Sequence, residues 1–290
     1  MEKKLRITVG RHSGFCFGVK RAYEMTLKCA KNCRKPVCVL GKLVHNEDVV
    51  KKLRELGIEA VNSLDNIPKG TVIFTAHGTE PSLHRRAKSK GLTILDTICP
   101  NVLRAQKLAQ DYSKKNYQVI IFGDKNHKEV KSVYKWADKK PKIIENFGDL
   151  KKLKLEKNKK YCLISQTTQN LEQFKKIADY LKKKNLEKFV FFNTICRSTH
   201  DRQNEIRKLA RINEIVIVIG GKDSANSCRL YEIAKEINPR SYFIENSKEL
   251  KKSWFRNICE VAVGAGASTP EWVIEEVVKS IRDFTPNTCY

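Results

Sequence analysis

The stretch LDTICPNVLRAQKLA, residues 95–109, occurs a second time in altered form later in the chain. Residues 192–210 read FNTICRSTHDRQNEIRKLA, again with a cysteine after Thr-Ile and a glutamine seven positions beyond it. In both stretches the cysteine (Cys99, Cys196) stands between an apolar strand pattern and a helical pattern. Such self-similarity indicates a repeat architecture built from one strand–turn–helix unit.

A third copy of this unit begins at Cys16. In each copy a helical pattern leads to an apolar strand pattern that ends at a glycine, 24 or 25 residues after the cysteine. The three glycines are Gly41, Gly123 and Gly220. Because strands alternate with helices, we expect parallel sheets and an α/β fold.

Polar residues stand at the predicted strand ends in all three copies. Four positions after each glycine are His45, His127 and Ser224, and six positions after it are Glu47, Glu129 and Asn226. A second strand pattern in each copy (71–82, 160–170, 259–272) ends in His77, in Gln166 with Thr167, and in Ser268 with Thr269. The motif STPEW (268–272) also carries the signal of a Ser/Thr-capped helix start. Ligand sites of parallel sheets form at such carboxyl ends.

We therefore predict three similar small α/β domains arranged as a pseudo-threefold trefoil around one centre. The expected domains are residues 14–98, residues 99–193, and residues 194–284 together with an N-terminal strand within 1–13. The first contains Cys16, His45 and His77, the second Cys99, His127, Glu129 and Thr167, and the third Cys196, Ser224, Asn226 and Ser268.

The composition excludes some classes of protein. The chain has 290 residues, 41% of them hydrophobic, and no apolar run approaches the roughly 18 residues of a membrane helix. The N-terminus lacks the apolar stretch of a signal peptide. We expect a cytoplasmic protein with no membrane partner.

The formal net charge of +25 comes mostly from lysine, in runs such as 151–160 and 182–185. This pattern is typical of a solvated surface, and it also suits an anionic partner such as a nucleic acid or a phosphorylated substrate. Aromatic residues are not interleaved with the basic ones, as they are in nucleic-acid modules. We expect no specific nucleic-acid partner.

Ten cysteines are many for a cytoplasmic chain, whose reducing surroundings argue against disulfides. The chain has no two CxxC pairs of the kind that bind zinc. We interpret most cysteines as small core residues, namely Cys29, Cys33, Cys38, Cys162, Cys228, Cys259 and Cys289.

Cys16, Cys99 and Cys196 differ because they hold matching positions in the repeats and would point at one centre. Three thiolates can bind zinc, which usually takes a fourth ligand, or a [4Fe–4S] cluster, in which one iron would stay open to a substrate. We favour the cluster. Three buried structural cysteines are the alternative.

The remaining strand-end residues are suited to binding an oxyanion. The candidate donors are His45, His77, His127, Thr167, Ser224, Asn226 and Ser268. Glu129 is the acid in this cationic set: burial would favour its neutral form and nearby cations its charged form. A carboxyl there can deliver a proton. Glu47 is its positional twin, but HNEDVVKKL also reads as a capped helix start.

The motifs resemble the 4-hydroxy-3-methylbut-2-enyl diphosphate reductase family over nearly the whole chain. They are SGFCFGVKRA, LVHN, TAHGTEPS, DTICPNV, SQTT, NTICRSTHDRQ, GGKDSANSCRLYEIA and GAGASTPEWVIEEV. The resemblance implies a trefoil of three α/β domains around a [4Fe–4S] cluster. It also implies reductive loss of the substrate's 4-hydroxyl to give isopentenyl and dimethylallyl diphosphates, the last step of the non-mevalonate isoprenoid pathway.

Position by position, the resemblance implies three roles. The cluster ligands fall on Cys16, Cys99 and Cys196. The diphosphate-binding residues fall on His45, His77, His127, Ser224, Asn226 and Ser268. The proton-delivering pair falls on Glu129 and Thr167, and Thr167 also faces the substrate.

Three positions depart from the family pattern. Lys128 stands where the family usually has proline, and Ala225 stands where serine is common, so that only its backbone N–H could contact the ligand. Arg197 follows the third cysteine where a smaller or acidic residue is expected. None of these removes a ligand or the acid.

An electron donor is also expected. The sequence has no dinucleotide fingerprint in a strand–GxGxxG–helix context, so we expect an external one-electron donor such as a ferredoxin or flavodoxin.

Two alternative functions stay open. A diverged [4Fe–4S] dehydratase or reductase, such as a quinolinate-synthase-like enzyme, would act on another anionic substrate without needing the three histidines. A nucleic-acid-binding protein with a structural cluster would show no turnover and a steep salt dependence.

Overall fold

The computed structural model of the chain describes residues 5–284. It contains three parallel sheets of four strands each, which confirms the predicted α/β class and the three similar small units. Residues 1–4 of the predicted N-terminal segment, and Cys289, lie outside the described residues.

The three sheets share one strand order. The first has the order β3-β2-β4-β5, with β2 (Val37–Leu40), β3 (Ile58–Val61), β4 (Thr71–Phe74) and β5 (Thr93–Asp96). The second has the order β7-β6-β8-β9, with β6 (Gln118–Phe122), β7 (Lys142–Ile144), β8 (Lys160–Ser165) and β9 (Lys188–Phe191). The third has the order β11-β10-β12-β1, with β10 (Ile215–Ile219), β11 (Ser241–Ile244), β12 (Glu260–Ala265) and β1 (Arg6–Val9). In the third sheet, β1 takes the place that β5 and β9 hold in the others.

Helices connect the strands. They are α1 (Phe17–Asn32), α2 (Glu47–Glu55), α3 (Pro81–Ser89), α4 (Pro100–Lys114), α5 (Lys128–Trp136), α6 (Phe147–Lys152), α7 (Leu171–Lys182), α8 (Arg197–Ile212), α9 (Ala225–Ile237) and α10 (Glu271–Phe284). Short 3₁₀ turns lie at Leu64–Asn66, Ser247–Glu249 and Lys252–Phe255.

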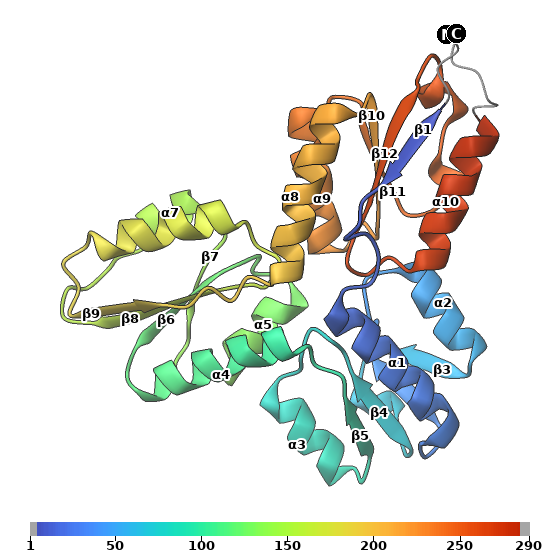
Figure 1. The fold of residues 1–290 in the computed structure, drawn as a ribbon. Helices are drawn as coiled ribbons and strands as arrows, with labels where there is room; N and C mark the ends of the chain where they lie inside the picture. Colours follow the sequence, from blue (N-terminus) through green and yellow to red (C-terminus); the bar gives the residue numbers. More distant parts are fainter. Residues whose placement is uncertain (1–4, 285–290) are drawn as a thin grey trace. The chain divides into compact units, whose positions relative to one another are not determined.

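Both faces of the sheets are covered, as the continuous apolar strands require. In β10, Ile217 packs toward α10, while the next residue, Val218, packs toward α8 and α9 on the opposite face. The second sheet likewise lies between α6 and α7 on one face and α4 and α5 on the other. Figure 1 shows these helices on the two sides of each sheet.

The repeat extends to individual hydrogen bonds. The N–H of each repeat glycine donates to the last residue of the neighbouring strand: Gly41 to Val61, Gly123 to Ile144 and Gly220 to Ile244, at 2.7, 2.9 and 2.9 Å. The chain therefore leaves the sheet in the same way three times, and the polar residues four and six positions later start from equivalent points.

The chain divides into two compact units. The single-sheet unit contains β1 and β10–β12 and comprises the described parts of Met1–Lys20 and Arg197–Tyr290, together with Val44–Leu53. The two-sheet unit contains β2–β9 and comprises Arg21–Leu43 and Arg54–Cys196. The predicted boundaries of three domains stay a prediction.

Two details correct the sequence analysis. Cys29 and Cys33 form a disulfide, although we expected free core residues. Their spacing of four places them one helical turn apart, with their Cα atoms 4.8 Å from each other. α10 begins at Glu271, so Pro270 and not Ser268 or Thr269 stands directly before it, and the Thr269 hydroxyl donates to the Ile219 carbonyl at 3.0 Å.

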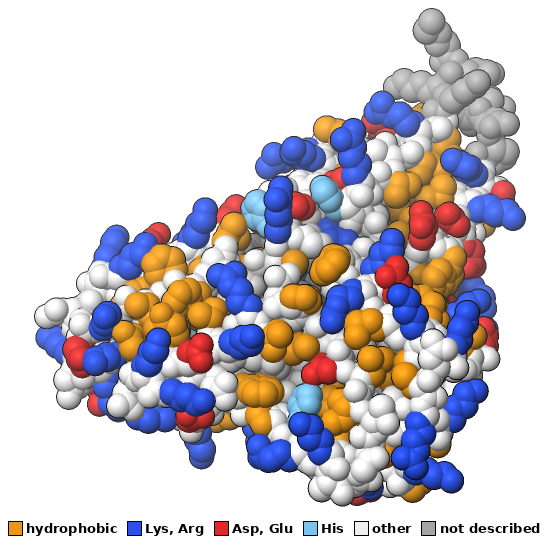
Figure 2. Space-filling view, turned by 60° about the horizontal axis from the view of Figure 1, so that its bottom comes forward, with side chains coloured by type: hydrophobic (Ala, Val, Ile, Leu, Met, Phe, Trp, Pro, Cys, Tyr) orange, Lys and Arg blue, Asp and Glu red, His pale blue; other side chains and the backbone are white. Residues whose placement is uncertain are grey.

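Basic side chains are spread over the face seen in Figure 2, with acidic ones among them. This distribution agrees with a solvated lysine-rich surface. Within residues 5–284, no helix is both long and apolar enough to cross a membrane.

Candidate functional site

The three predicted cysteine ligands occupy one structural position. Each stands directly before a helix: Cys16 before α1, Cys99 before α4 and Cys196 before α8. The backbone N–H of each cysteine donates to a carbonyl two residues beyond a strand end. The acceptors are Ala267 after β12, Ala76 after β4 and Thr167 after β8, at 3.1, 3.0 and 2.9 Å. Cys16 belongs to the single-sheet unit, and Cys99 and Cys196 belong to the two-sheet unit.

These three cysteines are partly exposed, and the sulfur atoms of Cys16 and Cys196 face hydrogen-bond donors. Asn101 Nδ2 lies 3.2 Å from Cys196 Sγ, and the Val19 N–H lies 3.4 Å from Cys16 Sγ. Such donors, and the helix N-termini beside them, stabilise negative charge on sulfur. The cysteines are therefore suited to bind metal as thiolates.

The other cysteines are less suited to metal binding. Cys162 is completely buried in the core of the second sheet, and burial raises the pKa of its thiol to about 12. Cys38 is also buried, and burial raises its pKa. Both are core residues, as we predicted. Cys228 and Cys259 are half-buried, which corrects their assignment to the core.

His77 and His127 lie together in the two-sheet unit, with their ring centroids 5.6 Å apart. His127 caps α5, and its Nδ1 accepts the N–H of Glu129 at 3.2 Å. Burial, assisted by the charge of Lys128, lowers the pKa of His127 to about 4. The ring is therefore neutral at pH 7, with its proton on Nε2, where it can donate to a ligand.

Glu129 is held by a single residue. One carboxylate oxygen accepts the Thr167 N–H at 2.7 Å, and the other accepts the Thr167 hydroxyl, also at 2.7 Å. The side chain is buried, and this burial raises the pKa of Glu129 to about 7. The two hydrogen bonds from Thr167 oppose that rise, and the nearby Asp124 adds to it. A carboxyl group with this pKa can release a proton at neutral pH.

The single-sheet unit gathers another part of the predicted site. The Ser268 hydroxyl donates to the His45 carbonyl at 3.2 Å and lies 3.5 Å from the Ser224 hydroxyl. Ser224 caps α9, and Ala225 is the first residue of that helix. Gly221 lets His45 approach closely, because a Cβ at this glycine would lie 2.4 Å from the His45 carbonyl oxygen.

Asn226 has a buried side-chain amide that is suited to bind a ligand. Its side chain is buried, yet neither its amide nitrogen nor its amide oxygen has a hydrogen-bond partner among the described residues. An unpartnered buried amide costs about 1–3 kcal/mol, so it is typically retained for a ligand. It lies in the first turn of α9, whose N-terminus favours an anion.

The less favoured candidates lie elsewhere. Glu47 is the exposed first residue of α2, and Asn46 accepts the Val49 N–H at 3.1 Å, so HNEDVV is a capped helix start. Arg197 has a 94% exposed side chain that lies 3.7 Å from Asp201, so it is a surface residue.

Two residues that support the site were not predicted. Asn101 follows Cys99 by two positions, and its sequence context gave no sign that it would reach Cys196. Arg202 is buried within α8 and donates to the Gly14 carbonyl at 2.7 Å, which supports the loop that contains Cys16. The available signal was its place in the motif NTICRSTHDRQ, which supports the family resemblance.

Known proteins match the chain over nearly its full length. The sequence model described as LytB protein matches residues 7–282. Two relatives are named 4-hydroxy-3-methylbut-2-enyl diphosphate reductase. The one from Geobacter metallireducens is 38% identical over 280 residues, covering 97% of this chain and 98% of the relative. The one from Clostridioides difficile is 36% identical over 281 residues, covering 97% of this chain and 100% of the relative.

Solved structures agree with these matches. A structure described as (E)-4-hydroxy-3-methyl-but-2-enyl diphosphate reductase, the terminal enzyme of the non-mevalonate pathway, matches with a TM-score of 0.71 and 35% identity, covering 96% of this chain and 99% of that one. The structure of the E-1-hydroxy-2-methyl-but-2-enyl-4-diphosphate reductase from Plasmodium falciparum matches with a TM-score of 0.90 and 31% identity. The match covers 98% of this chain and 89% of that one.

These neighbours are enzymes of one class, the oxidoreductases. Three equivalent α/β repeats, each opening a helix at a cysteine, agree with that class. The chain belongs to the LytB protein family, whose members use an iron–sulfur cluster.

Proposed function

We propose that this chain reduces (E)-4-hydroxy-3-methylbut-2-enyl diphosphate to isopentenyl and dimethylallyl diphosphates, with loss of the 4-hydroxyl as water. The observation that carries the proposal is the position of Thr167. Its side chain and N–H bind the buried acid Glu129, and its carbonyl accepts the N–H of Cys196. One residue therefore connects a proton source to a metal ligand.

Cys16, Cys99 and Cys196 would hold a [4Fe–4S] cluster. The donor set fits this group, because the sulfurs of Cys16 and Cys196 face N–H donors and all three cysteines open helices. When bound, the cluster supplies electrons one at a time and, with three protein ligands, leaves one iron for the substrate.

The diphosphate would be bound by hydrogen-bond donors and helix N-termini. The residues are His45, His77, His127, Thr167, Ser224, Ala225 (through its N–H), Asn226 and Ser268. The unpartnered amide of Asn226 and the Nε2 proton of His127 are donors of the required kind. Because Ser224 already accepts hydrogen bonds from the Ser227 N–H and hydroxyl, its own hydroxyl proton would point toward the anion.

Glu129 would deliver its proton through Thr167. When Glu129 is ionised, the Thr167 hydroxyl donates to it. When Glu129 is protonated, its O–H can donate to the same hydroxyl oxygen, which turns the Thr167 proton outward, toward the departing hydroxyl of the substrate. A pKa of about 7 keeps both states populated at neutral pH.

The two electrons would arrive singly from an external donor such as a ferredoxin or flavodoxin. A reduced viologen can replace that protein in the test. Protein purified without oxygen should contain about four irons per chain and should convert the substrate to both diphosphate products. Iron-loaded protein that binds the substrate but forms neither product would contradict the proposal.

A further inference from the structure

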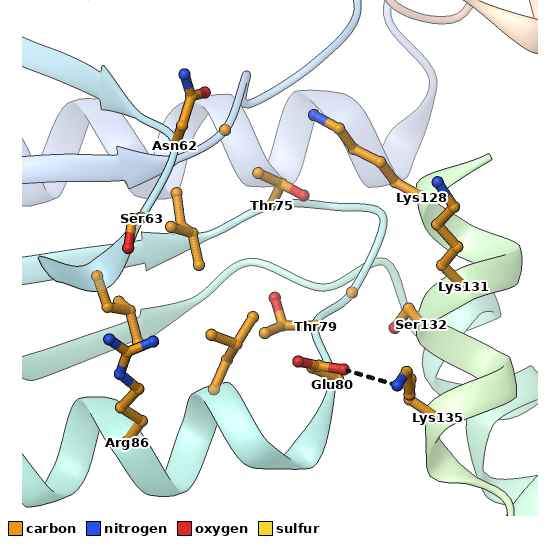
Figure 3. Close-up of a pocket in the computed structure, with 15 residues that line it drawn as sticks. Asn62, Ser63, Thr75, Thr79, Glu80, Arg86, Lys128, Lys131, Ser132 and Lys135 are labelled. Carbon is orange, nitrogen blue, oxygen red and sulfur yellow. Dashed lines mark ion pairs between the residues drawn. The ribbon is translucent and has the colours of Figure 1, made fainter. Parts of the chain in front are cut away.

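The two-sheet unit contains a cavity of about 590 Å³. It lies at the carboxyl ends of β2, β3 and β4, between α3 and one face of α5 (Figure 3). Of the described residues that line it, none is a predicted ligand, substrate-binding residue or acid of the site above. A volume of this size is ordinary for a small-molecule site.

One wall of this cavity is cationic. Lys128, Lys131 and Lys135 stand at helical spacings of three and four on α5, so they share one face of the helix, with Ser132 between them. Figure 3 shows them on the side of the cavity opposite Asn62, Ser63 and Arg86.

Basic residues outnumber acidic ones in the described lining. Glu80 is the one acid among the described lining residues, and it lies 4.0 Å from Lys135. Arg86 pairs with Asp65. The basic residues of the described lining are Lys128, Lys131, Lys135 and Arg86. The Lys128 ammonium is directed toward the end of β2, where a Cβ at Gly41 would lie 3.1 Å from it.

The rest of the described lining mixes three leucines with polar residues. Leu40, Leu64 and Leu83, which belong to elements other than α5, are its leucines. Thr75 and Ser132 are buried, and Ser132 accepts a hydrogen bond from Gln106 at 2.6 Å. A row of lysines on one helix face, together with three leucines in the same cavity, matches a ligand with a charged head and a short apolar body.

We propose that this cavity binds an organic phosphate that carries a small apolar group. The phosphate lies against Lys128 and Lys131, and the apolar group packs on the leucines. Short phosphorylated alcohols of any origin share this chemistry, and so do the products of the reaction proposed above. The ligand class follows from the lining alone and does not depend on that reaction.

Calorimetric titration of the full chain tests the proposal, with dimethylallyl diphosphate, pyrophosphate and dimethylallyl alcohol as probes. The Asn226→Leu protein serves as background, because it lacks the amide proposed for the substrate site. Dimethylallyl diphosphate should bind once per chain, more tightly than pyrophosphate, and the alcohol should bind weakest. Leu83→Ala should reduce the preference of the cavity for dimethylallyl diphosphate over pyrophosphate.

Charge reversal gives the matched comparison. Lys131→Glu should weaken dimethylallyl diphosphate binding at least tenfold, the loss expected for one charge-assisted contact. Lys176→Glu makes the same change at an exposed position of α7 outside the cavity and should change affinity less than threefold. Equal losses in the two variants, equal affinity for pyrophosphate, or no binding in the Asn226→Leu background would overturn the proposal. Turnover, measured separately with the viologen, tests the proposed reaction independently.

Discussion

Both hydrogen-bond donors of Thr167 face one carboxylate: its N–H and its hydroxyl each lie 2.7 Å from an oxygen of the buried Glu129. Two opposing effects act on this acid. Desolvation favours its neutral form, and the two donors favour its charged form, yet its pKa is still raised to about 7. Burial is the stronger effect, so the protein keeps a proton where water is excluded.

The role of Glu129 as the acid predicts a separation of turnover from binding. Glu129→Gln should keep the cluster and keep substrate affinity within about tenfold, because the amide is nearly isosteric. It should lose about 10²- to 10⁴-fold in turnover, the usual contribution of general acid catalysis. Viologen-coupled turnover and calorimetry measure the two effects. Glu47→Gln, at an exposed position, is the control, and near-normal turnover of Glu129→Gln would exclude Glu129 as the acid.

The pKa of Glu129 also predicts how stability depends on pH. Its folded-state pKa of about 7 exceeds the ordinary 4.5, so the folded protein binds this proton more tightly than the unfolded chain does. The stabilisation from Glu129 is therefore full below pH 4.5 and is lost as the pH rises toward 7. His127, with a pKa lowered from 6.5 to about 4, has the opposite effect between pH 4 and 6.5.

A comparison of the wild-type protein with Glu129→Gln separates the effect of Glu129 on the pH dependence of stability from that of His127. Relative to Glu129→Gln, the wild-type protein should lose roughly 3 kcal/mol between pH 4.5 and 8, at about 1.4 kcal/mol per pKa unit. Parallel thermal melts at pH 5 and pH 8 measure this difference. Profiles that stay parallel would show that the carboxyl is not shifted.

The equivalence of Cys16, Cys99 and Cys196 predicts that each is needed for the cluster. Serine at any one of them should remove most iron from anaerobically prepared protein, which otherwise contains about four irons per chain. Cys228→Ser and Cys259→Ser are suitable controls because these cysteines are also half-buried. Iron analysis and the visible absorption spectrum report the outcome. A loss of iron in a control as large as that in Cys99→Ser would refute the assignment.

Asn226 predicts an inverse relation between binding and stability. Asn226→Leu keeps the size of the side chain but removes two unpartnered polar atoms. The ligand-free protein should gain about 1 kcal/mol or more in unfolding free energy, while the diphosphate substrate binds ten- to a hundredfold more weakly. Denaturant unfolding and calorimetry measure the two quantities. A destabilised variant with unchanged affinity would mean that the amide serves the fold.

Asn101 predicts a change in electron affinity. Its amide donates toward Cys196 Sγ, which stabilises the more negative, reduced state of a bound cluster. Asn101→Leu should therefore lower the midpoint potential without loss of iron, as measured by a redox titration followed by electron paramagnetic resonance. Asn204→Leu, on the exposed face of α8, is the matched control. An unchanged potential would assign Asn101 a structural role only.

Much of the fold could be predicted because the chain repeats. Matching intervals from cysteine to glycine require matching helix and strand lengths, and the three sheets follow from them. The exposure of Glu47 could be anticipated from its capping context, whereas the burial of Glu129 could not. The two glutamates stand six positions after equivalent glycines, but α2 begins at Glu47 and α5 one residue before Glu129. A shift of one residue turns a helical side chain by about 100°.

The sequence by itself determined the repeat, the residue types at the strand ends and the family resemblance, because these are local or periodic properties of the chain. Only the tertiary structure decided which side chains meet. The Asn101 amide reaches Cys196 across 95 positions, and Thr167 holds Glu129 across 38. It also decided which acid is buried and which cysteines form a disulfide. Desolvation and hydrogen bonding depend on neighbours distant in sequence, and no spacing along the chain encodes them.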